Sequence, residues 1–252
     1  MARLDGRTAI VTGGAKSLGL AFAGALAAEG ANIVIADIED AAQAAREIAD
    51  AHCVEAIARI TDVADEAAVE AFVEMTMARF GRIDILVNNA ALFATVPLMP
   101  FTEVPVDLFD RIMAVNIRGS FLMARQVAPH MIAAGSGKIV NISSGTACKG
   151  MPDMLPYVAS KAAVLGLTRS MARELGPHGI NVNTLAPGLI ESDSVLENRH
   201  HLAISEKVIG SRALPRAGLT GDLPGALLFL ASGDSDFVTG QTLVVDGGSV
   251  ML

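Results

Sequence analysis

Short apolar runs alternate with longer amphipathic stretches along the chain of 252 residues. The runs are rich in Val, Ile and Leu and lack polar alternation, which is typical of strands buried on both faces of a parallel sheet. Helical stretches connect them, so the pattern predicts an α/β fold with a doubly wound parallel sheet in a single domain. The predicted strands are residues 8–12, 32–37, 54–60, 84–88, 138–143, 180–185 and 242–245, with helices at 18–29, 39–50 and 66–80.

One stretch departs from this alternation. Residues 190–215 are polar, carry several charges and follow the sixth predicted strand. Open α/β sheets bind ligands beyond the carboxyl ends of their strands, and long loops there are often binding segments. We therefore predict a substrate lid at about 190–215, with a solvated insertion as the alternative.

Composition narrows the possible partners. The formal net charge of −8 leaves no basic stripe for nucleic acid or anionic lipid. The chain is 52% hydrophobic, but its longest apolar stretches fall well short of the roughly 20 residues of a spanning helix. Its start carries no signal-peptide pattern. We expect a cytoplasmic protein that binds neither nucleic acid nor membrane. Cys53 and Cys148 suggest neither a disulfide framework nor a zinc site.

A glycine-bearing turn joins the first strand to the first helix, in the order Thr12-Gly13-Gly14-Ala15-Lys16-Ser17-Leu18-Gly19. Gly13 permits a tight turn, and Gly19 allows the helix to approach the sheet closely. The helix N-terminus then offers N–H groups and a positive dipole end to a pyrophosphate. This position between a first strand and a first helix favours a dinucleotide site.

Asp37 ends the second predicted strand, close to where a dinucleotide fold places its ribose-binding acid. A carboxylate there accepts hydrogen bonds from both ribose hydroxyls and repels a 2′-phosphate. Lys16 acts in the opposite sense, because a cation in the loop could contact such a phosphate. We predict NAD rather than NADP; a surface Asp capping the next helix is the alternative.

Tyr157 and Lys161 lie four residues apart in a predicted helix, so they share a face. An ammonium near a phenol stabilises the phenolate, and we expect it to lower the tyrosine pKa toward working pH. Such a phenol can act as the proton donor or acceptor for a carbonyl and alcohol pair. Tyr157 is the single tyrosine of the chain.

These features recur together in a spaced set that resembles the short-chain dehydrogenase/reductase family. The set comprises Thr12–Gly19, Asn88-Asn89-Ala90, Asn116, Ser143-Ser144, Tyr157 with Lys161, Pro187-Gly188, Thr239-Gly240-Gln241 and Val245-Asp246-Gly247-Gly248. The likeness covers essentially the whole chain and implies a Rossmann-like fold. Within the family the chain is most similar to NAD-dependent secondary-alcohol dehydrogenases, including those acting on arylalkyl alcohols such as 1-phenylethanol.

The resemblance implies catalytic roles. Tyr157 would transfer the proton, and Ser144 would hydrogen-bond the substrate oxygen. Lys161 would lower the tyrosine pKa and hold the nicotinamide ribose, while Asn116, at a helix interruption, would anchor a water relay. The implied cofactor-binding residues are Gly13, Ser17, Leu18, Gly19, Asp37, Asp62, Val63, Asn89, Tyr157, Lys161, Pro187, Gly188, Ile190 and Ser192.

Three positions depart from the family pattern. Ser17 replaces the middle glycine of the phosphate loop, Ala91 the glycine after Asn88-Asn89-Ala90, and Ser192 a common threonine. The Cβ of Ser17 narrows the space for backbone approach, although its hydroxyl could donate to a phosphate oxygen. These departures concern cofactor affinity rather than the class of reaction.

The expected pocket walls are mostly apolar, which favours a hydrophobic secondary alcohol or its ketone as the small-molecule substrate. They are Phe93, Ala94, residues 151–155 and Leu189. One alternative is a 3-oxoacyl-carrier-protein reductase using NADPH, with Arg169 and Arg173 as hints of a basic entrance. Another is a non-catalytic dinucleotide-sensing protein. No Cys/His spacing supports a zinc-dependent alcohol dehydrogenase.

The family likeness also implies a homotetramer. In it, long helices at residues 106–133 and 156–175 would pack across a two-fold interface, and Val250-Met251-Leu252 would be buried near a neighbour.

Overall fold

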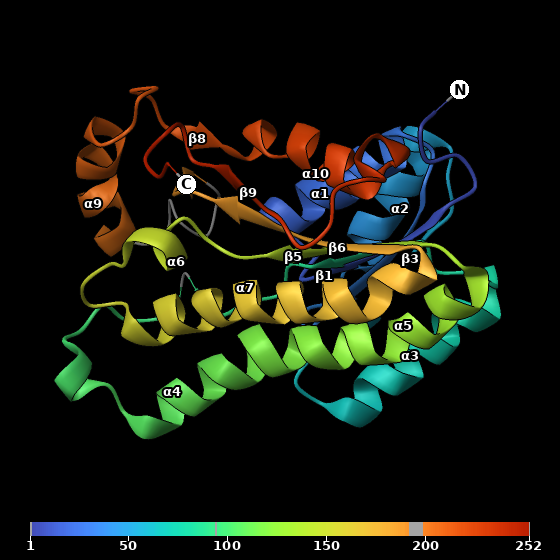
Figure 1. Cartoon of the computed structure of the whole chain (residues 1–252), viewed down its shortest axis with the longest axis horizontal. Coiled ribbons are helices and arrows are strands. Elements are labelled where there is room, and N and C mark those ends of the chain that lie inside the picture. Colours follow the sequence, from blue (N-terminus) through green and yellow to red (C-terminus); the bar gives the residue numbers. More distant parts are fainter. Residues whose placement is uncertain (1, 94, 192–198, 252) are drawn as a thin grey trace.

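A computed structural model describes residues 2–93, 95–191 and 199–251, with the backbone alone described at 199–204. Seven strands of this part form one parallel sheet in the order β3-β2-β1-β4-β5-β6-β9 (Figure 1). Strand order reverses between β1 and β4, which places a topological switch point at their carboxyl ends. The strands are β1 (Thr8–Thr12), β2 (Asn32–Asp37), β3 (Ala56–Ile60), β4 (Ile85–Asn88), β5 (Gly137–Ile142), β6 (Ile180–Pro187) and β9 (Thr242–Val245).

Helices cover both faces of the sheet, as the apolar strands predict (Figure 1). Phe22 of α1 and Leu227 of α10 are fully buried in the core on one face. Phe72 of α3 and Met123 of α5 are fully buried on the other face. The helices are α1 (Ser17–Ala28), α2 (Ala42–His52), α3 (Glu66–Phe80), α4 (Val106–Met113), α5 (Ser120–Ala134), α6 (Thr146–Lys149), α7 (Leu155–Leu175), α9 (Arg199–Gly210) and α10 (Pro224–Ala231). No helix of the described residues is both long and apolar enough to span a membrane.

The predicted doubly wound sheet and its seven strands are confirmed. The helix predicted at 39–50 begins at Ala42 instead, because the Asp40 carboxylate accepts the Ala42 N–H at 2.9 Å. The helix expected at 106–133 is not continuous: the π-helical turn Ala114–Gly119 separates α4 from α5. A π turn admits an extra residue into the helix and often marks a functional site.

The stretch predicted as a lid contains α9 and one short strand, which pairs with a second short strand just beyond the stretch. β7 (Ile190–Glu191) pairs in parallel with β8 (Gly218–Leu219). In Figure 1, α9 lies at the same end of the molecule as α6. Residues 192–198, including the predicted site residue Ser192, lie outside the described residues.

A chain of buried side-chain hydrogen bonds attaches α7 to the sheet. Asn88 of β4 donates to the amide oxygen of Asn141 of β5 at 2.9 Å. Asn141 in turn donates to the Thr168 hydroxyl of α7 at 2.9 Å, and Thr184 of β6 donates to the same hydroxyl at 2.9 Å. Thr168 is 1% exposed, so its partners have no access to bulk water.

We expect Thr168→Val to lower the free energy of unfolding by about 1–3 kcal/mol, because the isosteric change leaves two buried donors without an acceptor. Denaturant titration measures this loss. Ser170→Ala, an exposed position two residues further along α7, serves as the control and should change stability by less than about 0.5 kcal/mol. Equal effects of the two variants would contradict the proposed attachment.

Candidate active site

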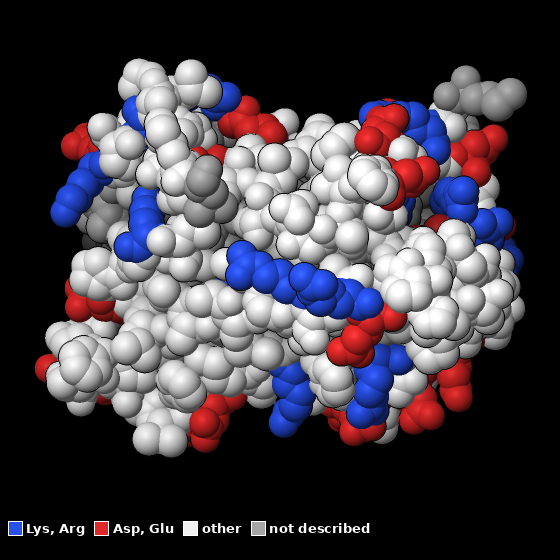
Figure 2. Space-filling model, in the orientation of Figure 1, with Lys and Arg blue, Asp and Glu red and all other residues white. Residues whose placement is uncertain are grey.

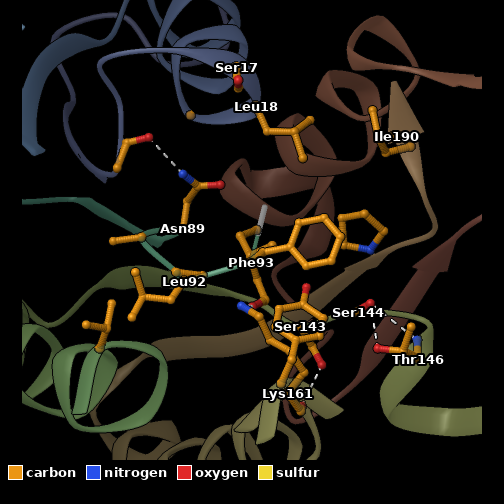
Figure 3. Close-up of a pocket in the computed structure, with 18 of the residues that line it drawn as sticks. Ser17, Leu18, Asn89, Leu92, Phe93, Ser143, Ser144, Thr146, Lys161 and Ile190 are labelled. Carbon is orange, nitrogen blue, oxygen red and sulfur yellow. Dashed lines mark hydrogen bonds between the residues drawn. The ribbon is translucent and has the colours of Figure 1, made fainter. Parts of the chain in front are cut away.

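A cavity of about 930 Å³ opens at the carboxyl ends of the parallel strands. It runs from Asp37, at the end of β2, to Tyr157 on α7, and Figure 3 shows the side chains that meet around it. All the predicted site residues within the described part line this cavity, apart from Asn116. They are Gly13, Ser17, Leu18, Gly19, Asp37, Asp62, Val63, Asn89, Ser144, Tyr157, Lys161, Pro187, Gly188 and Ile190.

The turn after β1 requires its glycines. Gly13 adopts a φ of +65°, and a Cβ on Gly19 would lie 1.9 Å from the Gly13 carbonyl oxygen. The Asn89 amide donates to the carbonyls of Thr12 and Gly13 at 2.9 and 3.0 Å, which fixes the turn against β4 (Figure 3). Asn89 therefore shapes the loop, in addition to lining the cavity as predicted.

The N-terminus of α1 faces the cavity. Helix α1 begins at Ser17, and no side chain caps its first turn. The N–H groups of a first helical turn and the positive end of the helix dipole suit a pyrophosphate. Ser17 itself has a φ of +53°, a left-handed conformation that favours glycine. The backbone thus keeps the shape of a family glycine although the residue carries a side chain.

At the adenosine end of the cavity, Asp37 is held by the backbone. Its carboxylate accepts the Ala15 N–H at 2.9 Å and the Glu39 N–H at 3.0 Å. Lys16, the cation that favours a 2′-phosphate, forms an ion pair with Glu39 at 2.6 Å. Asp62 and Val63 lie on the adjacent wall, after β3, as predicted for an adenine contact.

Ser144, Tyr157 and Lys161 line the other end of the cavity, and Figure 3 labels Ser144 and Lys161 there. Ser144 follows β5, and the two helical residues lie one turn apart on α7. All three are at most 7% exposed. Lys161 Nζ donates to the Ile142 carbonyl at 2.8 Å and lies 5.8 Å from the centre of the Tyr157 ring. The tyrosine and lysine thus share a face, as the spacing predicts.

Burial has the largest effect on the pKa values of both Tyr157 and Lys161. It raises the pKa of Tyr157 to about 12, while a hydrogen bond with Ser144 lowers it in part. Burial also lowers the pKa of Lys161 to about 8. The prediction that the neighbouring ammonium lowers the tyrosine pKa is therefore wrong for the protein alone. The removal of water from the phenol outweighs the lysine, whose hydrogen bond goes to Ile142.

Asn116 is buried in the π-helical turn, at the helix interruption that the family likeness implies. Its amide oxygen accepts the Leu92 N–H at 2.8 Å, and its amide nitrogen donates to the Ser160 hydroxyl at 3.0 Å. Ser160 donates to the Tyr157 carbonyl at 2.7 Å. Asn116 thus connects the loop after β4 to the first turns of α7, and its role in a water relay stays a prediction.

The predicted nicotinamide contacts Pro187, Gly188 and Ile190 lie at the end of β6. A residue that sequence reasoning missed, Arg212, holds this segment. Its guanidinium donates to the Leu189 carbonyl at 2.5 Å and to the Arg216 carbonyl at 2.7 Å, and it is 8% exposed. Arg212 lies in a polar stretch of the sequence, and nothing in that stretch indicates that its side chain is buried.

The substrate end of the cavity is apolar on one side. Phe93 packs on Tyr157 with ring centres 4.7 Å apart, and Met151, Met154 and Leu189 complete this wall. Ala94 lies outside the described residues, and Pro152, Asp153 and Leu155 of the predicted wall are not among the lining residues. Sequence reasoning missed a polar side formed by residues that carry no motif of their own: Thr146, Lys149 and Ser249.

The comparisons agree with this geometry. Residues 13–250 match the family model described as Enoyl-(Acyl carrier protein) reductase. Sorbitol dehydrogenase of Cereibacter sphaeroides is 42% identical over 99% of both chains. Galactitol 2-dehydrogenase of Agrobacterium fabrum is 39% identical over 99% of both chains. The chain belongs to the short-chain dehydrogenase/reductase family and is an oxidoreductase of the type that acts on alcohols and ketones.

Further relatives carry different cofactors and substrates. A 3-oxoacyl-[acyl-carrier-protein] reductase of Staphylococcus aureus is 36% identical over 97% of this chain and 98% of its own. A gluconate 5-dehydrogenase from Burkholderia cenocepacia, solved with NADP and tartrate, has a TM-score of 0.91 at 41% identity over 98% of this chain and 96% of its own. An NAD⁺-bound xylitol dehydrogenase has a TM-score of 0.90 at 32% identity over 98% of this chain and 100% of its own.

Proposed function

We propose that this protein transfers a hydride between NAD(H) and a hydrophobic secondary alcohol or its ketone. The observation that carries the proposal is the buried group of Ser144, Tyr157 and Lys161 at one end of a cavity whose other end holds Asp37. A proton donor, a hydrogen-bonding hydroxyl and a cation at one point suit a carbonyl that gains charge during reduction.

Each residue of the site has a separate role in the proposed reaction. Ser144 hydrogen-bonds the substrate oxygen, and Tyr157 gives a proton to that oxygen during reduction or removes it during oxidation. Lys161 supplies positive charge beside the phenol. A bound dinucleotide would supply or accept the hydride, and its oxidised form would carry a second positive charge. The loop of Gly13 and the first turn of α1 hold the pyrophosphate.

The choice of NAD rests on charge at the adenosine end. The Asp37 carboxylate repels a 2′-phosphate, and the Lys16 ammonium that would attract one is paired with Glu39 at 2.6 Å. Among the relatives, the xylitol dehydrogenase structure carries NAD⁺ and the gluconate 5-dehydrogenase structure carries NADP. The charges around Asp37 in this chain favour NAD.

The hydrophobic substrate follows from the wall beside Tyr157. Phe93 covers one face of the phenol, and Met151 and Met154 extend the apolar surface. Flexible methionines adapt to irregular ligands. The alternative of a carrier-protein reductase would use NADPH, which the Asp37 carboxylate opposes; Arg169 and Arg173, the hints of a basic entrance for the carrier, are exposed and do not line the cavity. A dinucleotide sensor would not need a complete proton-transfer group.

We further infer a homotetramer in the cytoplasm. Figure 2 shows that the face formed by α4, α5 and α7 is largely uncharged, with a basic band in the region of α7. Phe121 and Ile132 of α5 are 42% and 39% exposed to solvent. Apolar surface of this kind suits a contact between copies. Met251 is 81% exposed, consistent with a tail that a neighbouring subunit covers.

We expect Tyr157→Phe to abolish turnover, at least about 10³-fold, while NADH binding stays within about twofold, because the change removes the proton path alone. A panel of secondary alcohols with NAD, read by NADH absorbance, measures turnover, and fluorescence titration measures binding. Substantial residual activity would show that another group transfers the proton. A wild-type protein that binds NADH yet turns over no alcohol or ketone would favour the sensor.

We expect Asp37→Ala to raise the KM for NAD about tenfold and to relax discrimination against NADP, because the acid no longer binds the ribose hydroxyls or repels a 2′-phosphate. Steady-state kinetics with both cofactors test this. The control Asp40→Ala removes an acid of the same region that does not line the cavity. If Asp37→Ala kept the selectivity for NAD over NADP unchanged, Lys16 would be the residue that determines this selectivity.

A further inference from the structure

The substrate end of the cavity has a polar side opposite the apolar wall. Helix α6 follows Ser144 directly, and it contributes Thr146 and Lys149 to the cavity lining. Thr146 donates from its hydroxyl to the Ser144 oxygen at 3.0 Å, as the dashed line in Figure 3 shows. Polar groups thus extend from the reactive centre along α6, on a side of the cavity that the proposed hydride transfer does not use.

Lys149 is the cation of this side. Its Nζ donates to the Ser249 hydroxyl at 2.7 Å, and Ser249 lies 3.1 Å from the Ser211 hydroxyl. Lys149 is exposed and forms no ion pair with any residue in the described part of the chain. A lysine ammonium carries three donors, and a single hydroxyl partner leaves donors available to a ligand.

The acid of the same wall does not neutralise Lys149. Asp246 is buried, and one oxygen of its carboxylate accepts the N–H groups of Gly248 and Ser249 at 2.9 and 3.0 Å. Other acids that line the cavity, Asp37, Glu39 and Asp62, belong to its adenosine end. The substrate end therefore presents the Lys149 ammonium without an ion-pair partner in the described part of the chain, in a protein of formal net charge −8, although the buried Asp246 carboxylate belongs to the same lining.

We propose that the substrate carries a carboxylate distal to the reacting carbon and that Lys149, with Ser249, binds it; this proposal rests on the proposed function. The apolar wall of Phe93, Met151 and Met154 contacts the carbon chain between the two ends. The substrate class is a hydroxy acid or keto acid with an apolar body. This assigns Lys149 to substrate specificity, whereas the proton and hydride steps remain with the groups described above.

The test compares keto acids with their uncharged amides of nearly equal size. 4-Oxopentanoate and 5-oxohexanoate are assayed against 4-oxopentanamide and 5-oxohexanamide, with NADH consumption as the readout. We expect the wild-type protein to show a KM about 5- to 20-fold lower for the acid of at least one pair, as for a charge-assisted hydrogen bond. The difference should shrink as salt is added.

Substitutions assign the preference to a residue. Lys149→Gln should remove the preference for the acid, because the KM for the acid should rise while the KM for the amide stays the same. Its kcat should stay within about twofold of the wild-type value. Lys149→Arg should retain the preference. Arg46→Gln removes one positive charge on the outer face of α2 and should leave the preference unchanged. Arg111, another exposed cation of the lining, provides the competing assignment: loss of the preference in Arg111→Gln but not in Lys149→Gln would overturn the proposal.

Binding without turnover separates this proposal from the proposed function. Calorimetric titration of pentanoate and pentanamide into the protein with NADH present should show tighter binding of the carboxylate, and Lys149→Gln should remove that difference. If this holds while no ketone is reduced, the reaction assignment fails and the carboxylate site stands. Equal binding of acid and amide, or an equal effect of Lys149→Gln on both, would overturn the carboxylate site.

Discussion

The active site depends on a buried cation held by a single carbonyl. Lys161 is 3% exposed, and its ammonium donates to the Ile142 carbonyl at the end of β5. Burial lowers its pKa to about 8, so its charge changes with pH around that value. The same removal of water raises the pKa of Tyr157 to about 12. On the proposed mechanism, proton transfer by this phenol therefore needs more positive charge near it than the chain itself supplies.

The rest of the fold positions that pair against the sheet. Hydrogen bonds from Asn141 and Thr184 hold α7 through Thr168, and Asn116 holds its first turns through Ser160. At the other end of the cavity, the absence of a Cβ on Gly19 brings α1 close to the turn after β1. Because Asn141 and Thr184 belong to strands of the sheet that also carries the turn after β1, both ends of the cavity are positioned against one sheet.

Sequence reasoning identified what depends on local pattern. Continuous apolar runs predicted the seven strands of the main sheet but not the short pair β7 and β8, and the four-residue spacing of Tyr157 and Lys161 predicted their shared face. It missed what depends on packing between distant segments. Nothing in the local sequence shows that Arg212 is buried against Leu189 or that Lys149 meets Ser249, because these contacts join residues 23 and 100 positions apart. The direction of the tyrosine pKa was wrong for a similar reason, since burial is a property of the whole fold.

The most direct test of the central claim follows the ionisation of Tyr157 itself. The chain has one tyrosine and no tryptophan, so ultraviolet absorbance of tyrosinate reports this side chain alone. Spectra are recorded against pH with and without NAD⁺, for the wild-type protein and Lys161→Met. The account predicts a tyrosine pKa near 12 in the protein alone, a clear fall when NAD⁺ is bound, and a smaller fall in the variant. An unchanged titration with NAD⁺ would contradict it.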